Sequence, residues 1–283
     1  MRPQVIEGAG MTDGFGNLGD RAAAGLELAH SPAELLHGIA EALAHDGAGL
    51  RLDLQPVCSA NGLETVGYEA LLRWVHPDLG PILAIETVNA ATQAGLAEAL
   101  DRWVFAEACR IRARWPRSAP YISVNITAEA FLRGDGTALM RRALHEADTD
   151  PRGLVVEMPA NAVSLWHDAA ANLAAGLRGL GVVAALDDFG VARGTILALR
   201  AIPFPMVKLH PSLCAGLDGE SLAARRALAL TTGQVETAHA LGSIVVAKSV
   251  ETLAQLRALE KAGCDALQGW LLGRPGKVPN LTE

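Results

Sequence analysis

Apolar positions along this chain recur with two different periods, and the change between them predicts the fold. The first helix is expected to begin at Ser31-Pro32-Ala33-Glu34, which is a capping box with proline at the first helical position. Two strands are expected next, over residues 50–57 and 65–74. The turn between them contains Asn61-Gly62, which favours a hairpin and therefore an antiparallel pair.

From residue 84 onward, helical and strand patterns alternate along the chain. Helices are expected at 84–94, 97–115, 137–147, 168–179, 193–201, 220–241 and 251–262. Strands are expected at 121–126, 154–158, 182–186, 206–209, 243–247 and 265–268. Such alternation implies right-handed crossovers and a parallel sheet. Eight strands favour an α/β fold, a modified (β/α)8 barrel of the TIM type with one antiparallel strand from the N-terminal hairpin.

An open doubly wound sheet is the alternative architecture. The chain has no G-x-G-x-x-G after a strand and no P-loop motif, which weakens the nucleotide-binding versions of that alternative. With 283 residues, 50% apolar and 19% charged, the composition is typical of a globular α/β protein. The glycine-rich residues 1–30 are predicted to be a flexible leader, and residues 31–283 the barrel domain.

Charge and cysteine content exclude several classes of protein. The formal net charge of −7 argues against a general grip on DNA, which needs a basic face. The N-terminus lacks an apolar h-region and no apolar run reaches about 18 residues, so neither a signal peptide nor a membrane span is expected. The four cysteines lie far apart and indicate neither a zinc cluster nor a disulfide framework. A cytoplasmic location is the expectation.

Polar side chains close nearly every predicted strand. The apolar run at 182–186 leads directly into Asp187-Asp188. One such pair alone is explained by a helix cap and a solvated neighbour. In a parallel barrel, however, the carboxyl ends of all the strands meet and carry the chemistry. The other polar residues at the strand ends are Gln55, Glu69, Arg73, Asn125, Glu157, Lys208, Lys248 and Gln268.

The run Glu69-Ala70-Leu71-Leu72-Arg73-Trp74 is similar to the signature of EAL domains, the cyclic di-GMP phosphodiesterase family. The resemblance covers roughly residues 31–277, with further motifs of the family in order. They are Gln55-Pro56, Ser123-Val124-Asn125, Glu157, Asp187-Asp188-Phe189-Gly190, Lys208, Val250-Glu251-Thr252, Gln268-Gly269 and Gly273-Arg274-Pro275.

This resemblance implies a barrel that holds Mg²⁺ or Mn²⁺ by oxygen ligands, which hard cations prefer. In active members, two metals turn water into hydroxide for attack on one phosphodiester. The implied metal ligands are Glu69, Asn125, Glu157 and Asp187. The retained catalytic positions are Lys208 and Asp188. The implied ligand-binding residues are Gln55, Arg73, Glu251 and Gln268.

Three departures from the family pattern decide the expected function. The family's Ala-Glu-Gly reads Ala247-Lys248-Ser249 here, so an ammonium replaces the acid that serves the second metal. Two neighbouring cations repel, so the second metal site is expected to be lost, with Lys248 pairing with Asp188. The family motif that begins at Glu157 has a second acid three residues later, and Ala160 stands in its place here. The loop at 190–195 is also rewritten.

The third departure is His210, which stands where the family has an acid; a polar residue at the barrel rim is preferred over a new metal ligand. The pattern predicts a degenerate EAL domain that binds cyclic di-GMP and regulates an unidentified protein effector, with a homodimer possible. Two alternatives stay open. One is a protein-interaction module without ligand, and the other is a weak phosphodiesterase giving linear pGpG.

Overall fold

The computed structural model describes residues 30–127, 136–191 and 194–281. The predicted leader therefore lies outside the described residues except for His30. Residues 192 and 193 of the rewritten loop also lie outside them.

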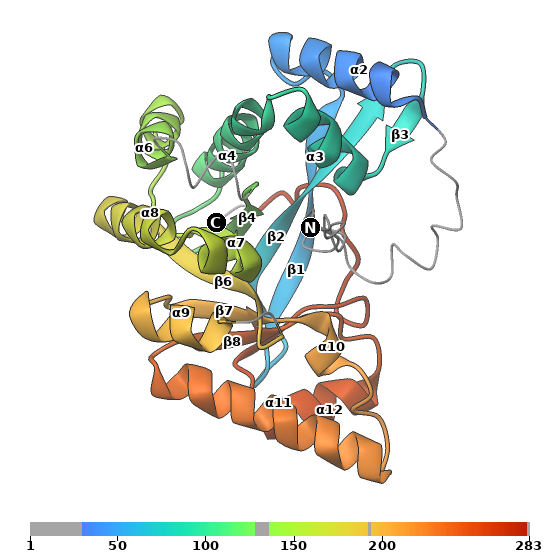
Figure 1. The fold of residues 1–283 in the computed structure, drawn as a ribbon, viewed down its shortest axis with the longest axis vertical. Coiled ribbons are helices and arrows are strands. Elements are labelled where there is room, and N and C mark those ends of the chain that lie inside the picture. Colours follow the sequence, from blue (N-terminus) through green and yellow to red (C-terminus); the bar gives the residue numbers. More distant parts are fainter. Residues whose placement is uncertain (1–29, 128–135, 192–193, 282–283) are drawn as a thin grey trace, which may run out of the picture.

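Eight of the described strands form a closed barrel (Figure 1). The sheet order is β1-β9-β8-β7-β6-β5-β4-β2, and a direct pairing of β1 with β2 closes the ring. Strand β1 is antiparallel to both of its neighbours, and the other barrel pairs are parallel. This confirms the modified (β/α)8 barrel, and the open sheet is wrong. The barrel strands are β1 (Leu50–Ser59), β2 (Thr65–His76), β4 (Tyr121–Asn125), β5 (Leu154–Pro159), β6 (Val183–Phe189), β7 (Met206–Leu209), β8 (Ile244–Ala247) and β9 (Ala266–Leu267).

Helices surround this barrel along its outside (Figure 1). They are α2 (Pro32–Ala44), α3 (Ala84–Gln93), α4 (Ala97–Ala113), α6 (Gly136–Glu146), α7 (Ala160–Leu165), α8 (His167–Leu180), α9 (Thr195–Ala201), α10 (Pro211–Cys214), α11 (Leu222–Ala240) and α12 (Leu253–Ala262). The sequence patterns missed three short elements. These are α7, α10 and the strand β3 (Gly80–Ile82), which pairs with the outer end of β2.

Helix α2 begins where its capping box predicts, with Ser31 and Glu34 at the two capping positions. It packs on the outer end of β2 at very short range. A side chain at Gly38 would place its Cβ 2.5 Å from the ring of His76 and 3.2 Å from that of Trp74. The glycine is therefore required for this close approach.

The β1–β2 hairpin is longer than the other strand pairs and runs beyond them toward β3 (Figure 1). Its register pairs Gln55 with Glu69 and Arg51 with Arg73. Because side chains alternate along a strand, these four project from one face of the hairpin. Leucines and an alanine occupy the opposite, mostly buried face, including the pairs Leu52–Leu72 and Leu54–Ala70.

The C-terminal segment lies across the same hairpin. Leu54 N–H donates to the carbonyl of Gly276 at 2.7 Å, and Gly276 N–H donates back to Leu54 at 3.0 Å. The indole of Trp115 donates to the carbonyl of Pro279 at 3.2 Å. These contacts fasten the chain after β9 to the first strand of the barrel.

Two negative expectations concern the described residues. None of their helices has the length and apolar character needed to cross a membrane. All four cysteines are buried thiols without a disulfide partner. The cytoplasmic location remains a prediction.

Candidate functional site

The carboxyl ends of the barrel strands bring most of the predicted site residues together. The strand register pairs Asn125 of β4 with Glu157 of β5, and it pairs Glu69 of β2 with Ser123 of β4. We call the charged group at this mouth the carboxylate cluster. It consists of Glu69, Glu157, Asp187, Asp188, Lys208 and Lys248.

Lys208 lies at the centre of this cluster, although its side chain is only 2% exposed. Its Nζ donates to Glu69 Oε2 at 2.6 Å and to both carboxylate oxygens of Glu157 at 2.7 Å. Burial opposes the charge on Lys208, but the neighbouring carboxylates outweigh burial and raise its pKa well above the usual value. Lys208 is therefore a fixed ammonium ion.

The two glutamates that hold Lys208 differ in acidity. Burial acts to raise the pKa of Glu69, but the charges of Lys208 and Lys248 outweigh it and lower that pKa to about 2. Burial and the neighbouring Glu69 charge raise the pKa of Glu157 to about 7, against the opposing effect of Lys208. The ionised carboxylate next to Lys208 is thus chiefly that of Glu69, and Glu157 takes up a proton first as the pH falls.

Lys248 bridges the two aspartates that follow β6. Its Nζ donates to Asp187 Oδ1 at 2.6 Å and to Asp188 Oδ1 at 2.8 Å. The pairing with Asp188 was expected from the sequence, and the pairing with Asp187 was not. Burial opposes the charge on Lys248, yet the two aspartates raise its pKa. Burial and Asp187 raise the pKa of Asp188, while Lys248 acts in the opposite direction.

Asp188, which belongs to this ion pair, and Ser249, which follows Lys248, have unusual backbone conformations. Asp188 has φ of 56° and Ser249 has φ of 60°, in the left-handed region that favours glycine. The register of β6 against β7 also shifts between Leu186 and Phe189, on either side of the aspartates. Strain of this kind persists only where surrounding structure imposes it, and it concentrates at functional sites.

Two glutamines extend the cluster toward β1. Gln268 donates from Nε2 to Glu69 Oε2 at 2.8 Å, and Asn125 donates from Nδ2 to Glu69 Oε1 at 2.8 Å. Gln55 donates to the carbonyl of Gly273 at 3.0 Å. Among the described residues, the buried Oε1 of Gln268 accepts no hydrogen bond. A buried acceptor without a partner indicates a place where a ligand or water donates.

Three other predicted residues lie outside this network. Arg73 is partly exposed, and its Nε lies 3.2 Å from Asp53 Oδ2. Glu251 is exposed, and its ligand-binding role remains a prediction. His210 caps α10, since its Nδ1 accepts from the backbone N–H of Ser212 at 3.2 Å, and this agrees with the rim position preferred for it.

Sequence reasoning missed Asp53 and Arg51, which share the Gln55 face of β1. The signal was present, because both are separated from Gln55 by even numbers of residues and so project to the same side. Whether Asp53 and Arg51 lie next to Arg73 depends on the register of the hairpin, and that register cannot be predicted from individual positions in the sequence.

The cluster contains the donor types that divalent cations prefer, but in this arrangement its lysines occupy the carboxylates. Three carboxylates and an amide are hard oxygen donors of the kind that Mg²⁺ and Mn²⁺ prefer. Counted as ionised, the cluster's four carboxylates and two ammonium groups leave a formal charge of −2. In the arrangement seen, the lysines hold the carboxylates. Within the described residues, no three or more His, Cys, Asp or Glu side chains are grouped so that they could hold a metal ion.

Comparison with known proteins places this geometry in a family. The sequence model of the EAL domain matches residues 38–275. The chain is 32% identical over 251 residues to the bifunctional diguanylate cyclase/cyclic di-GMP phosphodiesterase MucR of Pseudomonas aeruginosa, covering 88% of this chain and 36% of MucR. It is 32% identical over 230 residues to the oxygen sensor protein DosP of Escherichia coli, covering 80% of this chain and 28% of DosP. The chain spans about a third of the length of the first curated relatives it matches.

Solved structures agree with the sequence matches. The PaMucR phosphodiesterase in complex with c-di-GMP has a TM-score of 0.78 and 31% identity, covering 86% of this chain and 97% of that one. The FimX EAL domain from Pseudomonas aeruginosa bound to c-di-GMP has a TM-score of 0.79 and 26% identity, covering 87% and 98%.

Proposed function

The chain belongs to the EAL domain family, and we propose that it binds cyclic di-GMP at the barrel mouth without efficient hydrolysis. The observation that carries this proposal is the bridge from Lys248 to Asp187 and Asp188. Family resemblance assigns these aspartates to the second metal and a glutamate to the position of Lys248. Loss of a group used mainly in the transition state lowers turnover more than binding.

Lys208 and Asp188 keep the family's catalytic positions, but both are committed to ion pairs. Lys208 holds two glutamates and has a pKa well above its usual value, so it does not act as a base. Asp188 holds Lys248 at 2.8 Å. Neither residue supplies the carboxylate that the family uses at position 248.

Binding groups are better preserved than catalytic ones. We propose that the phosphates and bases of the ligand meet Arg73, Gln55 and Gln268, and the unpartnered Oε1 of Gln268 supports this. The residues that would hold one cation are Glu69, Asn125, Glu157 and Asp187. A cation bound there would neutralise the carboxylates that otherwise repel a phosphate.

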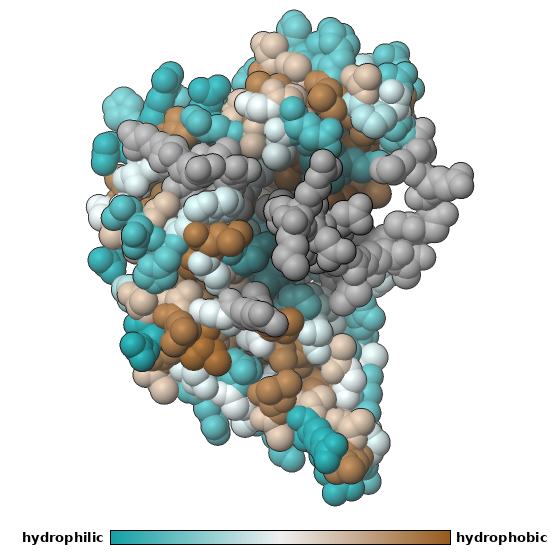
Figure 2. Space-filling view, in the orientation of Figure 1, coloured by the Kyte–Doolittle hydropathy of each residue, from teal (hydrophilic) through white to brown (hydrophobic). Residues whose placement is uncertain are grey.

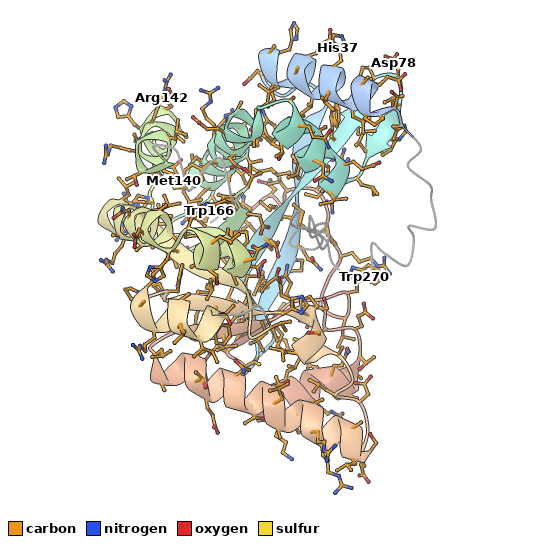
Figure 3. All side chains as sticks on the ribbon, in the orientation of Figure 1. His37, Asp78, Met140, Arg142, Trp166 and Trp270 are labelled. Carbon is orange, nitrogen blue, oxygen red and sulfur yellow. The ribbon has the colours of Figure 1, made fainter. Side chains whose placement is uncertain are left out.

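Calorimetry with cyclic di-GMP tests the binding proposal, with and without Mg²⁺. Arg73→Ala is expected to weaken binding at least tenfold, because a guanidinium that pairs with a phosphate is lost. The matched control is Arg142→Ala, an exposed arginine of α6 that is labelled in Figure 3. No binding at high micromolar ligand would refute the proposal.

A chromatographic assay with Mn²⁺ tests for hydrolysis to the linear dinucleotide pGpG. We expect turnover far below that of an active relative measured in parallel. Sustained turnover comparable to that relative would show that Lys248 does not disable catalysis. The receptor proposal would then be replaced by an active phosphodiesterase, whereas low but measurable turnover would support the weak phosphodiesterase alternative.

The protein-interaction alternative is favoured by a different observation. Apolar side chains are exposed over α7 and α9, where Figure 2 shows brown groups on the surface. Leu165 is 70% exposed, Leu197 65% and Ile196 44%. Patches of this kind often contact other proteins. Sedimentation of Leu197→Glu against Leu222→Glu, an exposed leucine of α11, tests for self-association through α9; equal behaviour of both variants and the parent chain would exclude it.

A further inference from the structure

Two arginines face each other on the open face of the β1–β2 hairpin. Arg51 and Arg73 are direct cross-strand partners. Like charges directly opposite each other destabilise a strand pair, so this arrangement needs a counterion. Asp53 provides it, since its Oδ1 accepts from Arg51 Nε at 3.1 Å and its Oδ2 lies 3.2 Å from Arg73 Nε. We call these three residues the arginine bridge.

The arginine bridge lies on the same face as the carboxylate cluster. Arg73 follows Glu69 by four residues on one strand, so their backbone positions are about 13 Å apart along the hairpin. Side-chain exposure rises outward, from 13% at Asp53 to 28% at Arg73 and 53% at Arg51. The bridge is therefore open to solvent at the rim of the mouth.

The bridge has more donor capacity than its internal partners use. A guanidinium carries five N–H donors. Within the described residues, Arg73 donates one hydrogen bond, from Nη1 to the carbonyl of Leu72 at 2.9 Å, and makes the ion pair with Asp53. One carboxylate between two guanidinium groups also leaves a formal charge of +1. The unused donors and the positive charge suit a second anion in addition to the Asp53 carboxylate. Guanidinium groups match phosphate oxygens bidentately.

We propose that Arg51 and Arg73 together bind a phosphate and that Asp53 competes with it for Arg73. The identity of the ligand as cyclic di-GMP rests on the function proposed above. Partly exposed ion pairs contribute little to stability, so a phosphate displaces Asp53 from Arg73 at small cost. Asp53 thereby sets the affinity of the mouth for nucleotide, and it offsets the repulsion between the two arginines when no other anion is bound.

Asp53→Asn tests this competition, because it removes the charge and keeps the shape. Binding of cyclic di-GMP is measured by calorimetry, and binding of inorganic pyrophosphate by thermal shift, since pyrophosphate requires only the arginines. We expect Asp53→Asn to tighten both at least fivefold and Arg51→Gln to weaken both several-fold. The control is Asp78→Asn, which makes the same change in net charge at an exposed aspartate near the outer end of the hairpin (Figure 3). It should stay within twofold of the parent chain.

The outcomes separate this inference from the proposed function. If cyclic di-GMP binds no variant while pyrophosphate stabilises Asp53→Asn at lower concentration, the ligand is wrong and the anion site stands. If Asp53→Asn leaves both affinities unchanged or weakens them, or if neither probe binds any variant, the inference is overturned.

A double variant guards against an indirect effect of Asp53→Asn on folding. In Asp53→Asn/Arg73→Gln the gain must disappear, because the arginine for which the anions compete is gone. A gain that persists would overturn the competition. If Asp53→Asn fails to fold, Arg51→Gln decides alone, and unchanged affinity for both probes would refute the paired site.

Discussion

Lys248→Glu is the substitution that most directly tests how the carboxylate cluster is balanced. It removes two ion pairs of 2.6 and 2.8 Å and adds a further carboxylate. At an effective dielectric constant near 20, a pair of unit charges at this range interacts by about 6 kcal/mol. The cost of burying Lys248 offsets much of that. Removing one partner of a buried pair typically costs about 3–5 kcal/mol, which we expect here without metal.

For a chain of this size, such a loss lowers the melting temperature by roughly 10 °C. The formal charge of the cluster also falls from −2 to −4, which favours divalent cations. A cation at 100 times its dissociation constant adds about 2.7 kcal/mol to stability. Mn²⁺ should therefore recover much of the stability that Lys248→Glu loses.

Thermal shift with increasing Mn²⁺ measures this, with Lys248→Met as the matched control. Methionine removes the ion pairs but adds no carboxylate, so its response to Mn²⁺ should lie between those of the parent chain and Lys248→Glu. We expect hydrolysis to stay low even with metal, because Ala160 and the 190–195 loop are unchanged. An identical Mn²⁺ shift in all three proteins would refute the assignment of Lys248 as a tethered cation.

Three further predictions follow from the geometry. Ser249→Gly relieves a left-handed backbone at φ of 60° and should raise the free energy of unfolding by up to about 1 kcal/mol. A lower free energy of unfolding in urea experiments would show that contacts of the serine outweigh the strain. Burial raises the pKa of Asp101 to about 8, so the folded chain holds a proton that the unfolded chain has released, and stability falls as the pH rises from about 4 to 8. Asp101→Asn should flatten that part of the urea-midpoint profile, and an unchanged slope would contradict the assignment. Lys208→Met leaves Glu69 and Glu157 without their shared cation and should lower the free energy of unfolding by about 3–5 kcal/mol. Part of this loss should be recovered at low pH, where Glu157 is protonated. A melting temperature equal to that of the parent chain at pH 7, measured by circular dichroism, would contradict this prediction.

Strong local signals explain why the sequence predicted the larger elements well. The strand Met206–Leu209 matches its expected range, and α2 begins at its predicted cap. The elements β3, α7 and α10 contain 3, 6 and 4 residues, too few to show a period. Their positions follow from packing against the barrel.

The sequence predicted which residues make up the site better than it predicted which of them form ion pairs with one another. Charge reversal at Lys248 indicated a partner among the aspartates, and Asp188 is one of the two it has. That Lys208 takes both Glu69 and Glu157 follows from how strands far apart in sequence meet at one mouth. Side-chain pairing across a barrel depends on register and strand stagger, which a sequence pattern leaves open.

The way β1 closes the barrel has a consequence for synthesis on the ribosome. Strand β1 reaches its second barrel neighbour only when Ala266–Leu267 has emerged, more than 200 residues later in the chain. At typical translation rates of about 5–20 residues per second, that edge waits roughly 10–40 s without its partner. An unpaired strand edge is a template for aggregation. The nascent chain therefore carries an open edge while the residues between β1 and β9 are synthesised, and a chaperone that covers β1 during this interval would improve the yield of closed barrels.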